Sequence, residues 1–188
     1  MRQIFGTALI TVACVLPVYS ETIKSSEGKS EASTKSSAIK STITTKIGET
    51  ARAKLFQTAR KLAEAPVLNK TEIEKITGKA LGQTAVGLMS SGKQPSDDIT
   101  STDVYFDREG KVTVVVLSVQ PKLNITEPQV ASAFGKPKRS KWSEEVYVQP
   151  KGKVYHSDYE LKKRNLTFSY ANTTPRKLAI INIYDRSK

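Results

Sequence analysis

One pattern occurs twice in this chain and constrains its fold more than any other feature. The first copy begins at Leu68-Asn-Lys-Thr-Glu72 and the second at Leu123-Asn-Ile-Thr-Glu127, 55 residues later. A short apolar segment follows in each copy and ends at a Gly-Lys pair, Gly78-Lys79 or Gly135-Lys136. Asn or Thr can cap a helix, Glu favours its positive end, and glycine can end it with a left-handed turn. The pattern therefore predicts two short helices, at Thr71–Ile76 and Glu127–Phe134.

Strand patterns follow each predicted helix. In the first copy, Thr102–Phe106 and Lys111–Val119 flank the polar turn Asp107-Arg-Glu-Gly110, which predicts a hairpin. In the second copy, Glu145–Val148 and Lys153–His156 flank Gln149-Pro-Lys-Gly152 in the same way. Two further strands are expected around Leu166, Phe168 and Tyr170 and at Leu178–Tyr184. A helix followed by a meander of about four strands predicts an α+β fold, with short helices packed on an antiparallel sheet. We expect two related helix-plus-meander units, at 66–120 and 121–188.

The residues before the first unit divide into two segments. Residues 21–37 are Ser, Thr, Lys, Glu and Gly with almost no apolar content, so we expect a disordered leader. From Ala38, apolar residues recur every three or four positions, and Pro66 ends the pattern. This predicts an amphipathic helix at 38–65. Its apolar stripe either packs on its own domain or serves as a surface for a membrane or a partner.

The first twenty residues have the form of a secretory signal peptide. A basic start at Arg2 is followed by the apolar stretch Ile4–Leu16, with small residues ahead of Glu21. The apolar stretch is shorter than the roughly 20 residues that span a membrane. We expect export to the periplasm or the extracellular space, with cleavage after Ser20. In the alternative, Thr11-Val-Ala-Cys14 is a lipobox and Cys14 becomes a lipid-anchored N-terminus. The mature chain then has no thiol on either interpretation, because Cys14 is the only cysteine.

The second copy carries a resemblance to a known group of proteins. Thr126-Glu-Pro-Gln-Val-Ala-Ser-Ala-Phe-Gly-Lys-Pro137 resembles the helix-to-turn signature of small bacterial envelope domains, with Trp142 and Tyr147 near the expected first strand. These are the outer-membrane assembly lipoproteins of the SmpA/OmlA type and the β-lactamase-inhibitor-protein-like fold. The resemblance covers mainly residues 126–184. It implies a non-catalytic protein-binding or envelope-assembly module.

The charge is unevenly distributed along the chain. The net charge is +12, and residues 121–188 carry 14 Lys and Arg against 6 Asp and Glu. A basic half favours anionic partners. Such a partner could be the acidic face of an envelope protein, which agrees with the assembly interpretation. It could also be an anionic polymer or surface, such as lipopolysaccharide, anionic lipid or nucleic acid. A solvated surface without a specific partner is the third interpretation.

The candidate binding residues cluster around one predicted turn. Gly135-Lys-Pro-Lys-Arg-Ser-Lys-Trp142 holds four cations and an indole, and the next hairpin adds more. Basic residues beside aromatic rings can hold anions and stack on planar groups. The hypothetical binding site consists of Lys136, Lys138, Arg139, Lys141, Trp142, Lys151, Lys153 and Tyr155.

Sequence motifs for catalysis are scarce. His156 is the only histidine. With Ser157 beside it, it could act as a general base, but a lone histidine on a strand is more often structural. A zinc site would need further histidine or cysteine ligands. We therefore expect neither catalytic residues, nor a bound metal, nor a small-molecule cofactor.

Overall fold

The structure, a computed structural model, describes residues 34–92, 96–145 and 152–185. Its helices are α1 (Thr34–Glu64), α2 (Lys70–Thr77), the short 3-10 helix η1 (Pro121–Leu123) and α3 (Glu127–Phe134). The strands in the first half of the sheet are β1 (Gly82–Ala85), β2 (Leu88–Ser90), β3 (Ile99–Phe106) and β4 (Val112–Val119). Those in the second half are β5 (Arg139–Glu145), β6 (Gly152–Glu160), β7 (Arg164–Ala171) and β8 (Lys177–Asp185). The predicted α+β fold is confirmed.

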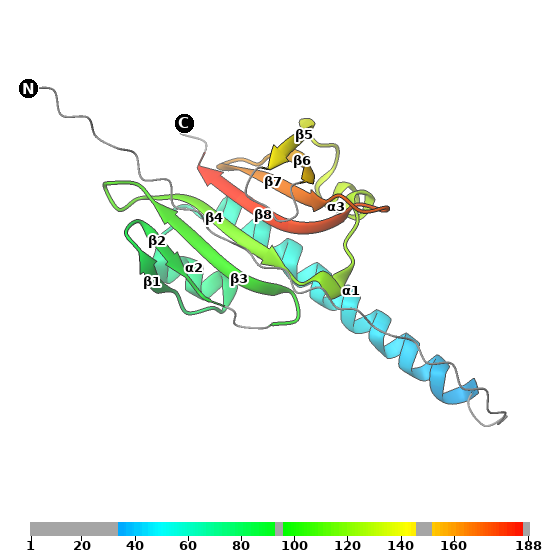
Figure 1. Ribbon diagram of the computed structural model, residues 1–188. Helices are drawn as coiled ribbons and strands as arrows, with labels where there is room; N and C mark the ends of the chain where they lie inside the picture. The colour runs from blue at the N-terminus through cyan, green and yellow to red at the C-terminus, as the bar shows by residue number, and fades with distance from the viewer. Residues whose placement is uncertain (1–33, 93–95, 146–151, 186–188) are drawn as a thin grey trace, which may run out of the picture.

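All eight strands form one antiparallel sheet, in the order β1-β2-β3-β4-β8-β7-β6-β5. The four strands that follow α2 make one half, and the four that follow α3 make the other half in reverse order (Figure 1). The halves meet where β4 pairs with β8, with Val114 opposite Tyr184 and Ser118 opposite Ile180. The two end strands, β1 and β5, therefore lie at opposite edges of the sheet.

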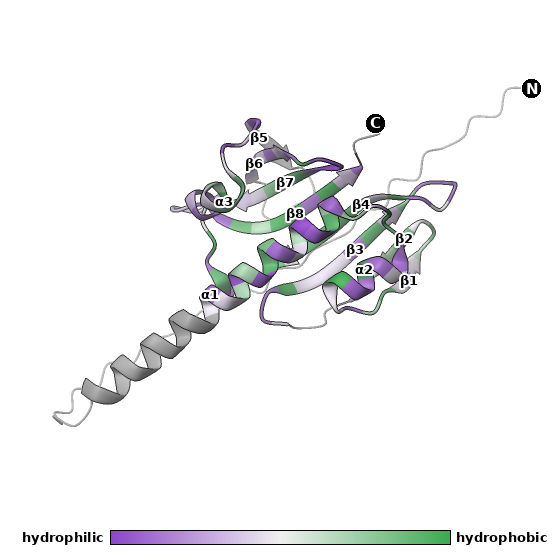
Figure 2. Cartoon of the chain, turned by 180° about the vertical axis from the view of Figure 1, so that it is seen from behind, coloured by the Kyte–Doolittle hydropathy of each residue, from purple (hydrophilic) through white to green (hydrophobic). Residues whose placement is uncertain are grey.

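The helices cover one face of this sheet. Figure 2 shows α1 crossing the sheet, with α2 and α3 on the same side. Helix α1 contributes Leu55, Ala59 and Leu62 to the core, each fully buried. From α3, the ring of Phe134 lies 4.9 Å from that of Phe168 in β7, measured between centroids. The core is thus a single layer between helices and sheet, and no described helix covers the sheet's second face, called the open face below.

Strand periodicity assigns each residue to one of these faces. In β4, Val115 and Leu117 are fully buried under the helices, while Val114 and Val116, which precede them by one position each, are only partly buried. In β7, Leu166 and Phe168 are fully buried on the helix side. Successive side chains of a strand point to opposite faces. The Val-Thr-Val-Val-Val-Leu-Ser-Val run of β4 therefore supplies both the core and the open face.

Capping residues set the bounds of the two short helices. The Asn69 side chain accepts a hydrogen bond from the Glu72 amide at 2.9 Å, and Gly78 ends α2 in the left-handed conformation. At α3, the Gln129 side chain accepts from the Thr126 amide at 2.9 Å. Both predicted helices are confirmed. The predicted left-handed turn is wrong for Gly135, which has positive φ but an extended ψ of −161°. It leads into a strand rather than reversing the chain.

The long helix is fixed to the sheet at its C-terminal end. Arg164, buried at the start of β7, donates hydrogen bonds to the carbonyl oxygens of Ala65, at 2.6 Å, and Leu62, at 3.3 Å. These carbonyls lack partners within the helix, so the guanidinium acts as a side-chain cap. Helix α1 begins at Thr34, four residues before the predicted start. The rest of the predicted leader and the signal segment lie outside the described residues. None of the described helices is both long and apolar enough to cross a membrane.

Two parts of the sheet differ from the prediction. The segment expected to be a basic turn, Gly135–Trp142, becomes strand β5 from Arg139 onward. The part of the predicted strand at 146–148 lies outside the described residues. Strands β1 and β2 were not expected, because Gly82–Ser90 carries glycines and few alternating apolar residues. Pairing along the edge of β3, with Leu88 opposite Tyr105, brings both into the sheet.

Candidate functional site: a groove on the open face of the sheet

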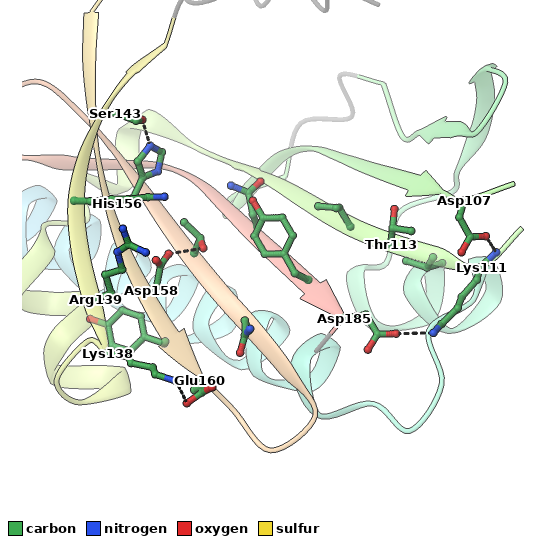
Figure 3. Close-up of a pocket in the computed structure, with 18 residues that line it drawn as sticks. Asp107, Lys111, Thr113, Lys138, Arg139, Ser143, His156, Asp158, Glu160 and Asp185 are labelled. Atoms are coloured by element: carbon green, nitrogen blue, oxygen red, sulfur yellow. Dashed lines mark hydrogen bonds and ion pairs between the residues drawn. The ribbon is translucent and has the colours of Figure 1, made fainter. Parts of the chain in front are cut away.

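The open face of the sheet is hollowed into a groove of about 880 Å³. Side chains from β4 to β8 line it, together with Asp107 and Lys111 from the β3–β4 turn (Figure 3). Five neighbouring strands thus contribute to one groove, on the face of the sheet that no described helix covers.

Cross-strand pairing arranges the floor of the groove in rows. One row consists of Arg139, Asp158, Thr167 and Asn182, each opposite the next on the neighbouring strand. Within it, the Thr167 hydroxyl donates a 2.6 Å hydrogen bond to Asp158. Directly opposed residues have Cβ atoms about 5 Å apart. A partner lying across the strands would therefore meet several polar side chains in register.

His156 lies in the neighbouring row, in the wall of the groove. Its Nε2 is 2.5 Å from the Ser143 hydroxyl, and its Nδ1 is 2.9 Å from the Ser169 hydroxyl. The side chain is buried, with both ring nitrogens hydrogen-bonded. Ser157, the partner considered from the sequence, follows His156 on the strand and so faces the helix side. The actual partners come from β5 and β7 and could not be recognised from sequence proximity.

The groove has equal numbers of basic and acidic side chains, but not all of them form ion pairs with each other. Four are basic and four are acidic: Lys111, Lys138, Arg139, Lys141, and Asp107, Asp158, Glu160, Asp185. The Lys138 ammonium lies 2.7 Å from Glu160, and that of Lys111 lies 3.1 Å from Asp185. Within the described part of the chain, Arg139 and Lys141 make no ion pair. Unpaired positive charge is thus concentrated at the β5 side of the groove.

Strand alternation divides the predicted binding site between the two faces. Lys138, Arg139 and Lys141 line the groove. Trp142 points to the other face, because it directly follows Lys141 on β5. Tyr155 lies opposite Trp142 on β6 and shares that face, as does Lys153, two positions before Tyr155. Lys136 is exposed in the loop before β5. Lys151 lies outside the described residues.

On the helix side, the aromatic residues form a stack with an arginine that was not predicted. The Trp142 and Tyr155 rings are 5.2 Å apart in an edge-to-face contact. The Arg176 guanidinium lies 4.0 Å from the Tyr155 centroid and 5.1 Å from that of Trp142. Its Nη1 is also 2.6 Å from a carboxylate oxygen of Glu127. Arg176, rather than one of the predicted lysines, is thus the cation in contact with these rings. Trp142 nevertheless remains 45% exposed.

The described residues contain no group of three or more His, Cys, Asp or Glu side chains that could hold a metal ion. The acidic residues of the first hairpin have local partners instead. Asp107 accepts hydrogen bonds from the backbone amides of Glu109 and Lys111, at 3.0 and 2.9 Å. Asp98 is buried and accepts from the Ser96 hydroxyl at 2.9 Å. These contacts account for carboxylates that otherwise suggest cation ligands.

Comparison with known proteins adds one structural likeness. No family model matches the chain, and no curated protein matches it. The structure is similar to the crystal structure of YjgB, a DUF4309 family protein from Bacillus subtilis, with a TM-score of 0.44 and 13% sequence identity. The match covers 74% of this chain and 97% of that one.

Proposed function

We propose that this protein is an exported, non-catalytic protein-binding module that binds its partner in the groove on the open sheet face. The observation that carries the proposal is the groove itself: five strands line a polar concavity that no described helix covers. Its equal numbers of acidic and basic side chains suit the mixed charge of a protein surface. A site for a polyanion would need an excess of cations along its whole length.

We further propose that the two halves of the sheet are related units. Each consists of a short capped helix followed by four strands in a meander, and the last strands, β4 and β8, pair with each other. The spacing of the two sequence copies agrees with this arrangement. Joining two such units through their last strands doubles the width of the open face. The groove lies mainly on the second unit and reaches β4 of the first.

Site-specific photocross-linking tests the protein-binding proposal. A photoreactive amino acid replaces Thr167 on the groove floor, and in a matched control it replaces Lys61, which is exposed on α1. In cells that express the protein, we expect discrete protein adducts from position 167. The same adducts should be absent when the photoreactive residue is at position 61. Mass spectrometry identifies the partner. A groove probe that gives no protein adduct contradicts the proposal.

The second candidate function is binding of an anionic polymer or surface. It is supported by Arg139 and Lys141, which are exposed and make no ion pair within the described chain. Counterion release makes such binding strongly dependent on salt. Cross-links from position 167 to nucleic acid or lipopolysaccharide, lost at high salt, would favour this alternative. Protein adducts that persist at high salt would favour the first proposal.

Export is tested separately by the intact mass of the protein recovered from outside the cytoplasm. A chain beginning at Glu21 supports cleavage after Ser20. A lipid-modified N-terminus at Cys14 would instead make the protein membrane-anchored and would change where its partner must be sought.

A further inference from the structure

The two edges of the sheet differ in how well they can accept another strand. Strand β1 is four residues long, and its pairing with β2 is irregular between Gln83 and Ala85. Strand β5 pairs with β6 over seven consecutive residues without a register shift, from Arg139 to Glu145. Within the described chain, β5 is paired on that side alone. Short, bulged edge strands discourage further pairing, whereas a long regular edge presents a row of free backbone donors and acceptors.

The side chains of β5 present two different surfaces to a strand beside it. Arg139 and Lys141 line the groove and make no ion pair with another described residue. Trp142 points to the opposite face and remains 45% exposed, although it contacts Tyr155 and Arg176. An added strand would place alternate side chains next to the two cations and the intervening ones next to the indole. Directly opposed side chains of neighbouring strands come within about 5 Å of each other.

We propose that the outer edge of β5 binds an extended acidic segment of a partner protein by adding it to the sheet as a ninth strand. The segment carries Asp or Glu at alternate positions, facing Arg139 and Lys141, and an apolar residue between them, facing Trp142. Backbone hydrogen bonds supply affinity, and the alternating side chains supply specificity. This inference rests on the proposed protein-binding function and names the partner's chemistry and the edge it uses.

Cations on an edge strand also have a simpler use, which is to prevent edge-to-edge association between copies of the chain. The two roles predict different behaviour when the charges are removed. If the cations bind an acidic strand, their loss weakens its binding. If they only protect the edge, their loss leaves the affinity for an acidic strand unchanged and promotes dimerisation.

The test uses a fluorescent peptide of about ten residues that alternates Glu with Val or Thr. Two further versions of the peptide are N-methylated, one at its odd-numbered residues and the other at its even-numbered residues. Each keeps the charge of the parent peptide but lacks the amide donors along one of its two edges. Fluorescence anisotropy measures binding to the full chain, to Arg139→Gln/Lys141→Gln, and to the matched control Lys61→Gln/Lys163→Gln. Amide hydrogen exchange of β5 is followed with and without peptide.

We expect saturable binding of the parent peptide, with slower exchange of amides between Arg139 and Ser143. One N-methylated version should lose binding. The β5 double variant should bind about tenfold more weakly, because two charge pairs at a partly exposed interface contribute on that scale. The control variant should change the affinity by less than about twofold.

Three results would overturn the inference. Equal binding of the parent and both N-methylated peptides would show charge attraction without strand pairing, which is the behaviour of a polyanion site. Unchanged affinity of the β5 double variant, with dimerisation, would show that the cations only protect the edge. Absence of saturable binding at about 1 mM peptide would exclude docking at the β5 edge. It would not decide the protein-binding proposal, which the cross-linking experiment at position 167 tests independently.

Discussion

The two faces of the sheet are made from the same strands and have opposite properties. Under the helices, β7 presents Leu166 and Phe168, which are fully buried. One position away, Thr167 points into the groove and hydrogen-bonds to Asp158. Burial of an apolar side chain contributes about 1.5–3 kcal/mol, whereas a partly exposed polar contact contributes about 1 kcal/mol or less. The fold therefore gains most of its stability on the covered face and depends much less on the residues of the open face.

This division predicts that substitutions of neighbouring residues have very different effects. Phe168→Ala removes a fully buried ring that packs against Phe134 and Tyr159. We expect it to lower the free energy of unfolding by about 3–5 kcal/mol. Thr167→Ala, one residue away, should cost about 1 kcal/mol or less. Urea denaturation monitored by circular dichroism measures both. Equal losses at the two positions would show that the open face is as important for stability as the core.

The second prediction concerns the connection between α1 and the covered face. Arg164→Ala removes both hydrogen bonds to the carbonyls of Leu62 and Ala65 and leaves these buried acceptors without the guanidinium. We expect a loss of about 2–3 kcal/mol in the free energy of unfolding. Faster hydrogen exchange in the last turn of α1 should accompany it. Unchanged exchange there would mean that apolar packing alone holds the helix end.

The third prediction concerns pH. Burial raises the pKa of Tyr170, which is fully buried on the covered face, above the ordinary tyrosine value of 10.0. Above about pH 10 the unfolded chain loses the Tyr170 proton while the folded chain retains it, so stability falls as pH rises. The slope contributed by this residue is at most about 1.4 kcal/mol per pH unit. Tyr170→Phe should flatten the decline between pH 10 and 11 in urea denaturation. An identical slope in the variant would contradict the assignment.

The smallest effect is expected on the open face. Replacing Lys138, Arg139 and Lys141 together with Gln removes exposed charges. Among the described residues, only Lys138 of the three has an ion-pair partner, Glu160. Surface substitutions of this kind change stability by about 0.5 kcal/mol or less each. Thermal unfolding should therefore remain close to that of the parent protein, while binding of an acidic partner weakens and loses much of its salt dependence. A variant that binds normally would show that these charges serve solubility alone.

Local sequence signals predicted the elements whose determinants lie close together in the chain. Asn69 and Gly78 mark the ends of α2, and the valine-rich run of β4 predicts a strand by its length and β-branched residues. Strand β5 was missed because its first residues, Arg139-Ser-Lys141, have low β propensity. Its strand conformation depends on pairing with β6, which cannot be predicted from the turn-like composition of residues 135–142.

The site was only partly predictable for a related reason. Arg139 and Lys141 were identified from their charge, but alternation separates them from Trp142 and Tyr155. Ser143 and Ser169 contact His156 from two different strands, and each is 13 positions from it in sequence. Such neighbours are set by strand order and register. Those depend on the β4–β8 pairing between distant segments, for which no local motif exists.

The β4–β8 pairing has a consequence for how the chain is made. Strand β4 ends at Val119, but its partner β8 begins at Lys177, so the pairing must wait until the last part of the described chain has been synthesised. Until then, Val112–Val119 is an uncharged, valine-rich strand with one edge unpaired, which is the type of segment that aggregates most readily. Pairing of segments so far apart also slows folding. During synthesis, the edge of β4 that later pairs with β8 thus stays unpaired until Lys177–Asp185 has been added.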